Sequence, residues 1–400
     1  MRKLSIFGLV AVAVAANASP VTSFNPMATF GAGGLANGWL ENSEHGYTAN
    51  PTGDRIRGMA YNAATNKVVI ADRSAAGTAA LKIHNAITGA YEGNYDMTGV
   101  SGGTFGFSKV AIAADGTTYA SNLTTNNAGT STYKIYKWTS PGSAPTVVYN
   151  GLVPDPVLLA GNGFRLGDTL DLIGTGANTR LVAGYANSSV AAQTGERGFA
   201  IFTDNGAGGL NVNSINTFSP ALPGDLGFRL GNTFVTPNSL VGIGDQGFRF
   251  ASSIDLTTNS ANQVVSTGMT GNQRAVDYIQ VGNCKLLASI DLFSGSTAAV
   301  NDGAMVVRIF DASNPASLGT VVSARAVPLG TVINGNLNQS GEVKWGAVTP
   351  AAQGYDLTLY ALTTNNGVQA FNVHVVPEPG TWITMGLGAL ALVARRRKKA

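Results

Sequence analysis

A heptapeptide that occurs twice is the feature that most constrains the fold of this chain. The sequence GFRLGDT at positions 163–169 returns as GFRLGNT at 227–233. Around both copies, short β-branched and aromatic runs alternate with clusters of Gly, Asn, Asp, Ser and Thr, and there is no long 3.6-residue period. An internal repeat at this distance in a strand-rich chain is typical of a β-propeller.

The same order of four expected strands recurs six times. Each opening strand carries one basic residue, and these are Arg57, Lys109, Arg165, Arg229, Arg274 and Lys344. Second strands are expected at 68–71, 118–121, 181–185, 240–243, 285–289 and 357–362. Third strands are expected at 81–84, 133–138, 199–202, 248–252, 305–310 and 368–375, and weaker fourth strands at 91–95, 147–149, 210–215, 263–266 and 320–323. We therefore predict an all-β fold, a single six-bladed β-propeller over residues 19–375.

The sixth repeat lacks a fourth strand, because the C-terminal segment begins directly after its third. An open sheet edge invites aggregation, so a closed ring needs another segment at this place. We expect the N-terminal segment around residues 27–40 to supply it. A seventh blade is the alternative if residues 20–56 hold further strands. A pair of β-sandwiches is the rival fold, although it would not require the four-strand order to recur.

The residues from 376 to 400 fall into three parts. Residues 376–379 read VPEP, an apolar run covers 382–394, and the basic block Arg395, Arg396, Arg397, Lys398 and Lys399 follows. The run is shorter than the roughly 20 apolar residues that usually span a bilayer. Gly380 and Thr381 extend it, however, and the arginines can reach the headgroups. We expect a membrane helix over 381–394 with a cytoplasmic basic stop at 395–399. A buried C-terminal helix is the alternative.

This order of parts resembles the PEP-CTERM sorting tail of exported bacterial proteins, with Pro377, Glu378 and Pro379 as the sorting motif. The resemblance covers residues 376–400 only and says nothing about the body. It implies export across the inner membrane of a Gram-negative-type bacterium and transient anchoring there. It also implies processing near the motif by a transpeptidase-like sorting enzyme of the exosortase type. The destination would be the cell surface or the extracellular matrix.

The other end of the chain predicts a signal peptide over residues 1–18. Met1-Arg2-Lys3 is a basic start, residues 4–16 are apolar, and Ala16-Asn17-Ala18 is a small-x-small cleavage pattern. The formal charge of +3 arises from the two ends, since acidic residues outnumber basic ones in the remainder. We therefore expect no nucleic-acid partner. Cys284 is the only cysteine, which excludes an internal disulfide and predicts a packed strand residue.

The six basic residues of the opening strands are the candidate binding site. If these strands lie innermost, the six cations would stand at similar heights around the axis. A concave ring of cations attracts anions, and guanidinium groups bind carboxylate or sulfate through two donors. An acidic polysaccharide is the ligand that this hypothesis favours. The alternative is that each cation pairs with a neighbouring carboxylate and links the blades. Candidates for that pairing are Asp54, Asp168, Asp277 and Glu342.

An enzyme is the less favoured interpretation, and we predict neither a cofactor nor a metal. The three histidines, His45, His84 and His374, lack the spacing of metal ligands. Four aspartates fall near strand ends, as in some propeller hydrolases, but at inconsistent positions: Asp72, Asp245, Asp277 and Asp291. A hydrolase or lyase of the lactonase type, acting through axial carboxylates, is thus the alternative to a binding or structural module. The tryptophans at 39, 138 and 345 fit a core better than a sugar-stacking surface.

Overall fold

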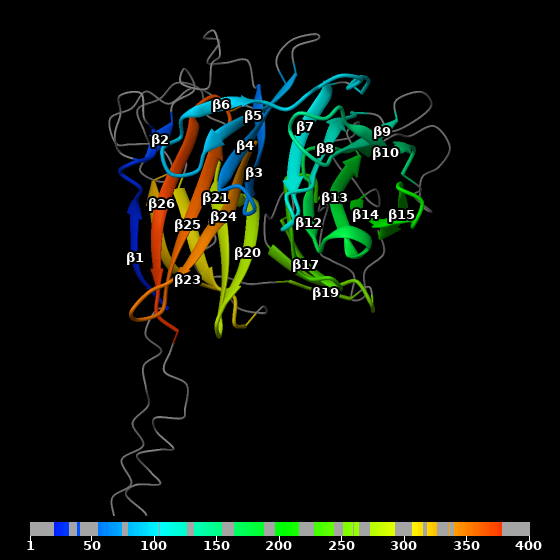
Figure 1. Ribbon diagram of the computed structural model, residues 1–400. Coiled ribbons are helices and arrows are strands. Elements are labelled where there is room, and N and C mark those ends of the chain that lie inside the picture. The colour runs from blue at the N-terminus through cyan, green and yellow to red at the C-terminus, as the bar shows by residue number, and fades with distance from the viewer. Residues whose placement is uncertain are drawn as a thin grey trace, which may run out of the picture.

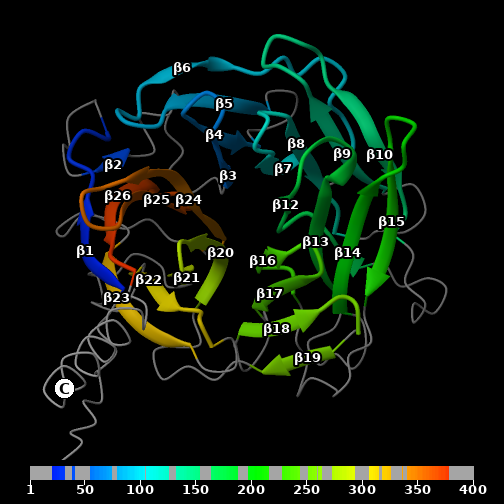
Figure 2. The same ribbon diagram turned by 60° about the horizontal axis from the view of Figure 1, so that its bottom comes forward.

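The computed structural model shows a six-bladed β-propeller (Figures 1 and 2). The residues that it describes are 20–31, 38–40, 55–73, 79–103, 105–125, 132–153, 164–187, 197–215, 228–243, 251–258, 260–263, 273–292, 306–314, 318–325, 336 and 340–377. The strands within these ranges form six antiparallel sheets arranged around one axis. They contain no α-helix and one short 3-10 helix, η2 (Gly176–Asn178).

The first three blades follow the predicted order from the axis outward. Blade 1 contains β3 (Ile56–Asn62), β4 (Lys67–Asp72), β5 (Ala80–Asn85) and β6 (Tyr91–Asn94). Blade 2 contains β7 (Phe105–Ile112), β8 (Thr118–Leu123), β9 (Tyr133–Trp138) and β10 (Thr146–Gly151). Blade 3 has a divided inner strand, β11 (Phe164–Arg165) and β12 (Asp171–Ile173), then β13 (Arg180–Asn187), β14 (Arg197–Asp204) and β15 (Leu210–Ile215).

The remaining blades complete the ring, and the six-bladed all-β prediction is confirmed. Blade 4 contains β16 (Gly231–Thr236), β17 (Ser239–Ile243), β18 (Ala251–Asp255) and β19 (Ser260–Gln263). Blade 5 contains β20 (Gln273–Val281), β21 (Cys284–Asp291), β22 (Val306–Asp311) and β23 (Gly319–Arg325). Blade 6 contains β24 (Gly341–Pro350), β25 (Tyr355–Thr363) and β26 (Gly367–Val375), with β1 (Val21–Pro26) as its outer strand.

The N-terminal segment closes the ring, as expected, but its main strand lies earlier than expected. β1 (Val21–Pro26) pairs antiparallel with β26, from Val21 opposite Val375 to Pro26 opposite Phe371. The shorter β2 (Trp39–Leu40) pairs further along the same strand. The expected segment, 27–40, therefore contains β2 but not the longer β1. Four of the six β1 residues are exposed, which explains why this strand has no clear apolar signal.

The two ends of the propeller differ in the length of their connections. Because all inner strands run in the same direction, the strand ends that are joined by blade-to-blade connections, and those joined by connections between second and third strands, lie at one end, which we call the loop face. Examples are 152–163, 188–196, 216–230, 292–305 and 326–340. The other end, the turn face, carries the short hairpins, such as 63–66, 237–238, 282–283 and 351–354. Long connections on a rigid scaffold are where binding residues are usually found.

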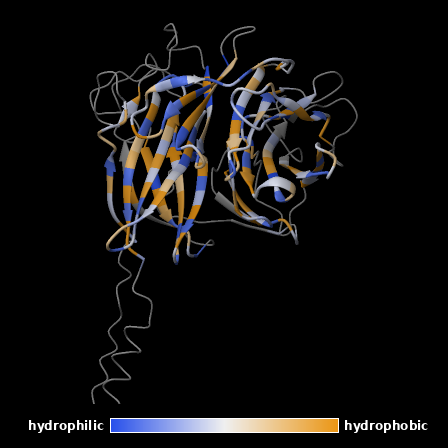
Figure 3. Cartoon of the chain, viewed as in Figure 1, coloured by the Kyte–Doolittle hydropathy of each residue, from blue (hydrophilic) through white to orange (hydrophobic). Residues whose placement is uncertain are grey.

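Packing between neighbouring sheets supplies the core, and the hydropathy colouring shows apolar residues along the strands of the blades (Figure 3). The largest cluster joins blades 5 and 6 and includes Leu286, Ile290, Leu359 and Val373. Cys284 is buried at the start of β21, as predicted. The three tryptophans expected to be core residues, at 39, 138 and 345, are also buried. Stability in the described region comes from apolar packing between sheets.

Several predictions fall outside the described residues. These are the signal peptide at 1–18, the membrane helix at 381–394 and the basic stop at 395–399. Among the described residues, no helix has the length and apolar character needed to cross a membrane. The domain limits of 1–18, 19–375 and 376–400 stay predictions.

Candidate functional site

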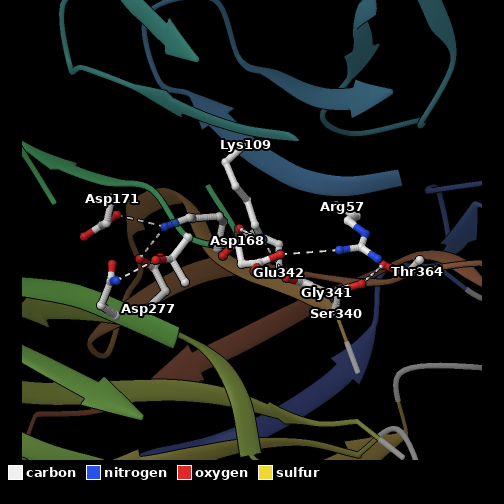
Figure 4. Close-up of polar contacts among 12 residues, drawn as sticks. Arg57, Lys109, Asp168, Asp171, Asp277, Ser340, Gly341, Glu342 and Thr364 are labelled. Atoms are coloured by element: carbon white, nitrogen blue, oxygen red, sulfur yellow. Dashed lines mark hydrogen bonds and ion pairs between the residues drawn. The ribbon is translucent and has the colours of Figure 1, made fainter. Parts of the chain in front are cut away.

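The six predicted cations lie on or directly before the innermost strands, towards the loop face. Arg57 and Arg274 are the second residues of β3 and β20, and Lys109 and Lys344 lie further along β7 and β24. Arg165 ends the short β11, and Arg229 stands just before β16. Together with the carboxylates that they contact, these residues form what we call the axial cluster (Figure 4).

A break in the inner strand of blade 3 allows Asp168 to reach the cluster. Residues 166–170 separate β11 from β12, and within them Leu166 pairs with Thr124 of blade 2 through two backbone hydrogen bonds. Gly167 follows with φ of +100°, and a β carbon there would lie 2.1 Å from the carbonyl oxygen of Asn122. Only glycine fits this conformation and this close approach. The first copy of the heptapeptide is therefore a turn that positions Asp168.

Asp168 is surrounded by three arginines from three blades. Arg165 contacts it through both Nε and Nη2, the latter 2.8 Å from Oδ1. Arg57 Nη1 lies 3.4 Å from Oδ1, and Arg229 Nη1 lies 3.7 Å from Oδ2. Burial alone would raise the pKa of Asp168. The hydrogen bonds and charge of Arg165, with the charges of Arg229 and Arg57, outweigh burial and hold that pKa well below its usual range.

Three arginines gather around one carboxylate, and two of them are partly open to solvent. The Arg165 and Arg229 side chains are 19% and 25% exposed, whereas those of Arg57 and Asp168 are 3% and 2% exposed. The repeat explains why Arg229 contacts a carboxylate of the other copy. The second heptapeptide copy has Asn232 where the first has Asp168, so Arg229 has no carboxylate within its own copy and contacts Asp168 instead. Arg165 and Arg229 therefore form the solvent-facing part of the axial cluster.

Lys109 joins blade 2 to blade 6, although blade 1 stands between them. Its Nζ donates to Glu342 Oε2 at 2.8 Å and to the carbonyl oxygen of Gly341 at 3.0 Å. Both side chains of the pair are less than 10% exposed. Figure 4 shows Lys109 extending towards Glu342. A pair this well satisfied and this deeply buried links blades rather than offering a free charge.

Lys344 of blade 6 contacts two carboxylates from other blades. Its Nζ lies 2.9 Å from Asp171 Oδ1 of blade 3 and 3.3 Å from Asp277 Oδ1 of blade 5. Burial and the charge of Asp171 raise the pKa of Asp277 to about 6, against the lowering effect of Lys344. For Lys344, burial lowers the pKa, but the carboxylates around it outweigh burial and raise it.

Backbone donors complete the coordination of these two carboxylates. The backbone N–H of Trp345 donates to Asp277 Oδ2 at 2.7 Å, and that of Phe234 donates to Asp171 Oδ2 at 2.8 Å. Arg274 is fully buried and donates from Nη1 to the carbonyl oxygen of Gln273 at 2.7 Å. Charge and hydrogen bonding thus connect blades across the axis, because blades 3 and 6 stand on opposite sides of a six-membered ring.

Five of the six predicted cations, Arg57, Lys109, Arg165, Arg229 and Lys344, contact carboxylates of the axial cluster, and three of the four carboxylates suggested as partners take part in the pairing. These are Asp168, Asp277 and Glu342. The fourth, Asp54, lies outside the described residues. Sequence reasoning missed Asp171. The available signal was its position three residues after Asp168 on an inner strand, but its partner Lys344 is far away in the chain.

Of the aspartates and histidines considered for catalysis and metal binding, Asp277 belongs to the axial cluster, and the others that the structure describes lie apart from it. Asp72 pairs with Lys82 at 3.5 Å and Asp291 with Arg308 at 2.9 Å, each within its own blade, and Asp245 lies outside the described residues. His84 is buried with its Nδ1 at 2.9 Å from the Gly89 oxygen, and burial lowers its pKa to about 4. Across the described ranges, no group of three or more His, Cys, Asp or Glu residues could hold a metal ion.

Comparison with known families finds two matches, one in the body and one in the tail. Residues 42–204 match the domain of unknown function DUF4623. Residues 375–398 match the PEP-CTERM protein-sorting motif, which confirms the resemblance drawn from the tail. The chain thus carries a sorting signal that implies export, transient membrane anchoring and processing by an exosortase-type membrane enzyme. No curated protein matches the chain.

Solved structures show the same fold at low sequence identity. A DUF4623 family protein from Bacteroides eggerthii is 16% identical, with a TM-score of 0.59, over 82% of this chain and 72% of that one. A protein of unknown function from Dyadobacter fermentans is 9% identical, with a TM-score of 0.50, over 81% and 96%. A mutant of the Aleuria aurantia lectin in complex with Fucalpha1-6GlcNAc is 9% identical, with a TM-score of 0.50, over 84% and 100%.

Proposed function

We propose that this protein is an exported binding module whose propeller takes an acidic polysaccharide at Arg165 and Arg229, at the cell surface or in the extracellular matrix. The observation that carries the proposal is the gathering of three arginines around Asp168, with the side chains of Arg165 and Arg229 partly exposed to solvent. Lys109, in contrast, is buried and pairs closely with Glu342.

The chemistry of the pair suits a carboxylated or sulfated sugar. A guanidinium group can donate two parallel hydrogen bonds to either anion, and it is weakly hydrated compared with an ammonium group. Asp168 holds Arg165 through two contacts, so the ordering cost of that side chain is already met before a ligand arrives. The lectin named above was solved in complex with Fucalpha1-6GlcNAc, so a protein of similar fold binds a glycan. This analogy of fold supports the proposal but does not identify a site.

The test compares two double variants that change the net charge equally. Arg165→Ala/Arg229→Ala removes the solvent-facing pair. Arg180→Ala/Lys285→Ala removes two cations from the starts of β13 and β21, on the turn face. Residues 19–377 contain every described strand of the ring and are used for all three proteins. Each is titrated with polygalacturonate, dextran sulfate and neutral dextran at low and moderate salt.

The parent and the turn-face variant should bind at least one acidic polymer, more weakly as salt rises, and should not bind neutral dextran. The Arg165→Ala/Arg229→Ala protein should lose about tenfold or more in affinity, since each charge-assisted hydrogen bond contributes about 1.5–3 kcal/mol. Equal losses of affinity in both double variants would mean that binding depends only on net charge, which would contradict the proposed site. Release of reducing ends from either polymer would instead favour the hydrolase or lyase alternative.

A further inference from the structure

The sorting motif follows the last strand of the propeller without a spacer. Val375 is the final residue of β26 and pairs with both Val21 of β1 and Tyr355 of β25. The next residue, Val376, donates its backbone N–H to the carbonyl oxygen of Pro20 at 2.8 Å. Pro377, the first proline of the motif, comes immediately after. The tail therefore leaves the fold at the turn face, at the lower end of β26 in Figure 1.

Two turns of the turn face pack closely against the residues at which the tail leaves the fold. A β carbon placed on Gly282, in the turn between β20 and β21, would lie 3.4 Å from Pro377 Cγ and 3.4 Å from Tyr355 Cε2. One placed on Gly354 would lie 2.0 Å from the Val375 oxygen and 3.0 Å from Val376 Cα. Gly354 has φ of +87°, so glycine is required there both for the turn conformation and for the close contact with Val375 and Val376. Val376 and Pro377 are accordingly only half-exposed.

This position conflicts with what a sorting enzyme requires. An enzyme that cuts a peptide bond must receive several residues of extended chain in its cleft. An extended chain advances about 3.3 Å per residue, so the two residues from Pro377 to Pro379 reach only about 7 Å. A cleft that accepts the motif would therefore press against the 282–283 and 351–354 turns before the residues ahead of the motif could enter it.

We propose that Pro20 and Val21, with the turns that carry Gly282 and Gly354, form a clip that holds the root of the sorting tail, and that the sorting enzyme acts on the state in which this clip is open. The clip joins the two ends of the ring, so it exists only once β1 has paired with β26. Completion of the propeller thereby slows processing of the tail. The inference depends on the sorting motif and is independent of polysaccharide binding.

The clip can open without opening the ring. The pairing of β1 with β26 is irregular between Val21 and Ser23, whereas Phe24 to Pro26 pair regularly with Val373 to Phe371. Met27 adds a further backbone bond to Ala370 at 2.9 Å. Chain ends open with much lower free energy than core strands. Releasing Pro20 and Val21 would free the Val376 amide, while Val375 stays paired with Tyr355 of β25 and the rest of β1 keeps the sheet edge covered.

The test follows the full-length chain in a bacterium that carries an exosortase-type sorting enzyme, by pulse-chase detection of precursor and processed forms. One variant inserts Gly-Ser-Gly-Ser between Val376 and Pro377, which moves the motif away from the clip. A second, Val21→Ser, weakens the clip from the opposite strand and leaves the motif intact. The control places the same four residues between Ala207 and Gly208, an exposed hairpin of the turn face remote from the tail.

Both clip variants should be processed faster than the parent. For the insertion we expect an increase of about tenfold, because the closed clip loses the stabilisation of one or two hydrogen bonds and its opening precedes cleavage. The control should match the parent. Hydrogen exchange of the purified full-length chain should show the Val376 amide protected in the parent and less protected in Val21→Ser. Equal processing rates of the parent and the tail insertion would overturn the proposal, and so would an unprotected Val376 amide in the parent.

Discussion

At the scale of residues, the axial cluster shows how one difference between two repeat copies directs an arginine of one copy to the carboxylate of the other. Asp168 and Asn232 occupy the same place in the heptapeptide. Asn232 donates from Nδ2 to Thr169 Oγ1 at 2.7 Å and thus joins blade 4 to blade 3 without a charge. Asp168, in contrast, serves Arg57, Arg165 and Arg229. The stability of the ring centre and the proposed binding of an anion therefore involve the same carboxylate.

Substitutions that change the charge at positions 168 and 232 should separate the effect on stability from the effect on anion binding. Asp168→Asn removes the charge of the carboxylate that three guanidinium groups contact and should destabilise the protein by about 3 kcal/mol, the usual cost of removing one member of a buried pair. Asn232→Asp gives Arg229 a carboxylate of its own, so it should cost less stability but weaken the binding of dextran sulfate. Urea unfolding and a binding titration of both variants measure this. Equal destabilisation by the two changes would contradict the assigned role of Asp168.

The sequence was sufficient to find the cations of this cluster but not all of their partners. The heptapeptide copies fix Arg165 and Arg229 as equivalent, and the recurring strand order locates the other four. Partners such as Asp171 for Lys344 come from opposite sides of the ring. Their proximity depends on blade number and on how far each strand reaches along the axis. Neither quantity can be read from local spacing.

At the scale of elements, the closing strand is where sequence and structure differ most. The inner and middle strands were predictable because they bury runs of apolar residues, as in β4, where five of the six residues are buried and four of those are apolar. β1 has only one fully buried residue, Val21. Its place is set by the free backbone edge of β26 rather than by side-chain burial, so a hydrophobic pattern could not locate its start.

The contribution of β1 can be tested with a substitution that leaves its backbone unchanged. Phe24 packs on Phe371 of β26 with ring centroids 4.6 Å apart. Phe24→Ala should therefore lower the free energy of unfolding by about 2 kcal/mol, less than a fully buried phenylalanine would. The matched control is Val147→Ala on β10, another outer strand, where the side chain is 50% exposed and the change should stay within about 0.5 kcal/mol. Thermal unfolding of both variants measures this difference. Equal free energies of unfolding would mean that β1 does not hold the ring closed.

At the scale of the whole molecule, the two functional features lie at opposite ends of the axis. The solvent-facing arginines stand at the loop face, where the inner strands begin, whereas β26 ends and the sorting tail departs at the turn face. An inner strand of about seven residues at about 3.3 Å each separates the two faces by roughly 20 Å. A chain held in a membrane by its tail would thus present Arg165 and Arg229 away from the bilayer.

This orientation predicts a difference between two labelling sites on the anchored precursor. Ser101, in a connection of the loop face, and Ala352, in a turn of the turn face, are both exposed. A donor dye on Ser101→Cys or Ala352→Cys is paired with an acceptor lipid in vesicles that hold the unprocessed chain. Energy transfer should be clearly stronger from position 352, because that dye lies nearer the membrane by most of the propeller's height. The unsubstituted protein, with Cys284 buried, corrects for background labelling. Equal transfer from both positions would mean that the anchored propeller lies on its side, and the arginine pair would then not be directed away from the membrane.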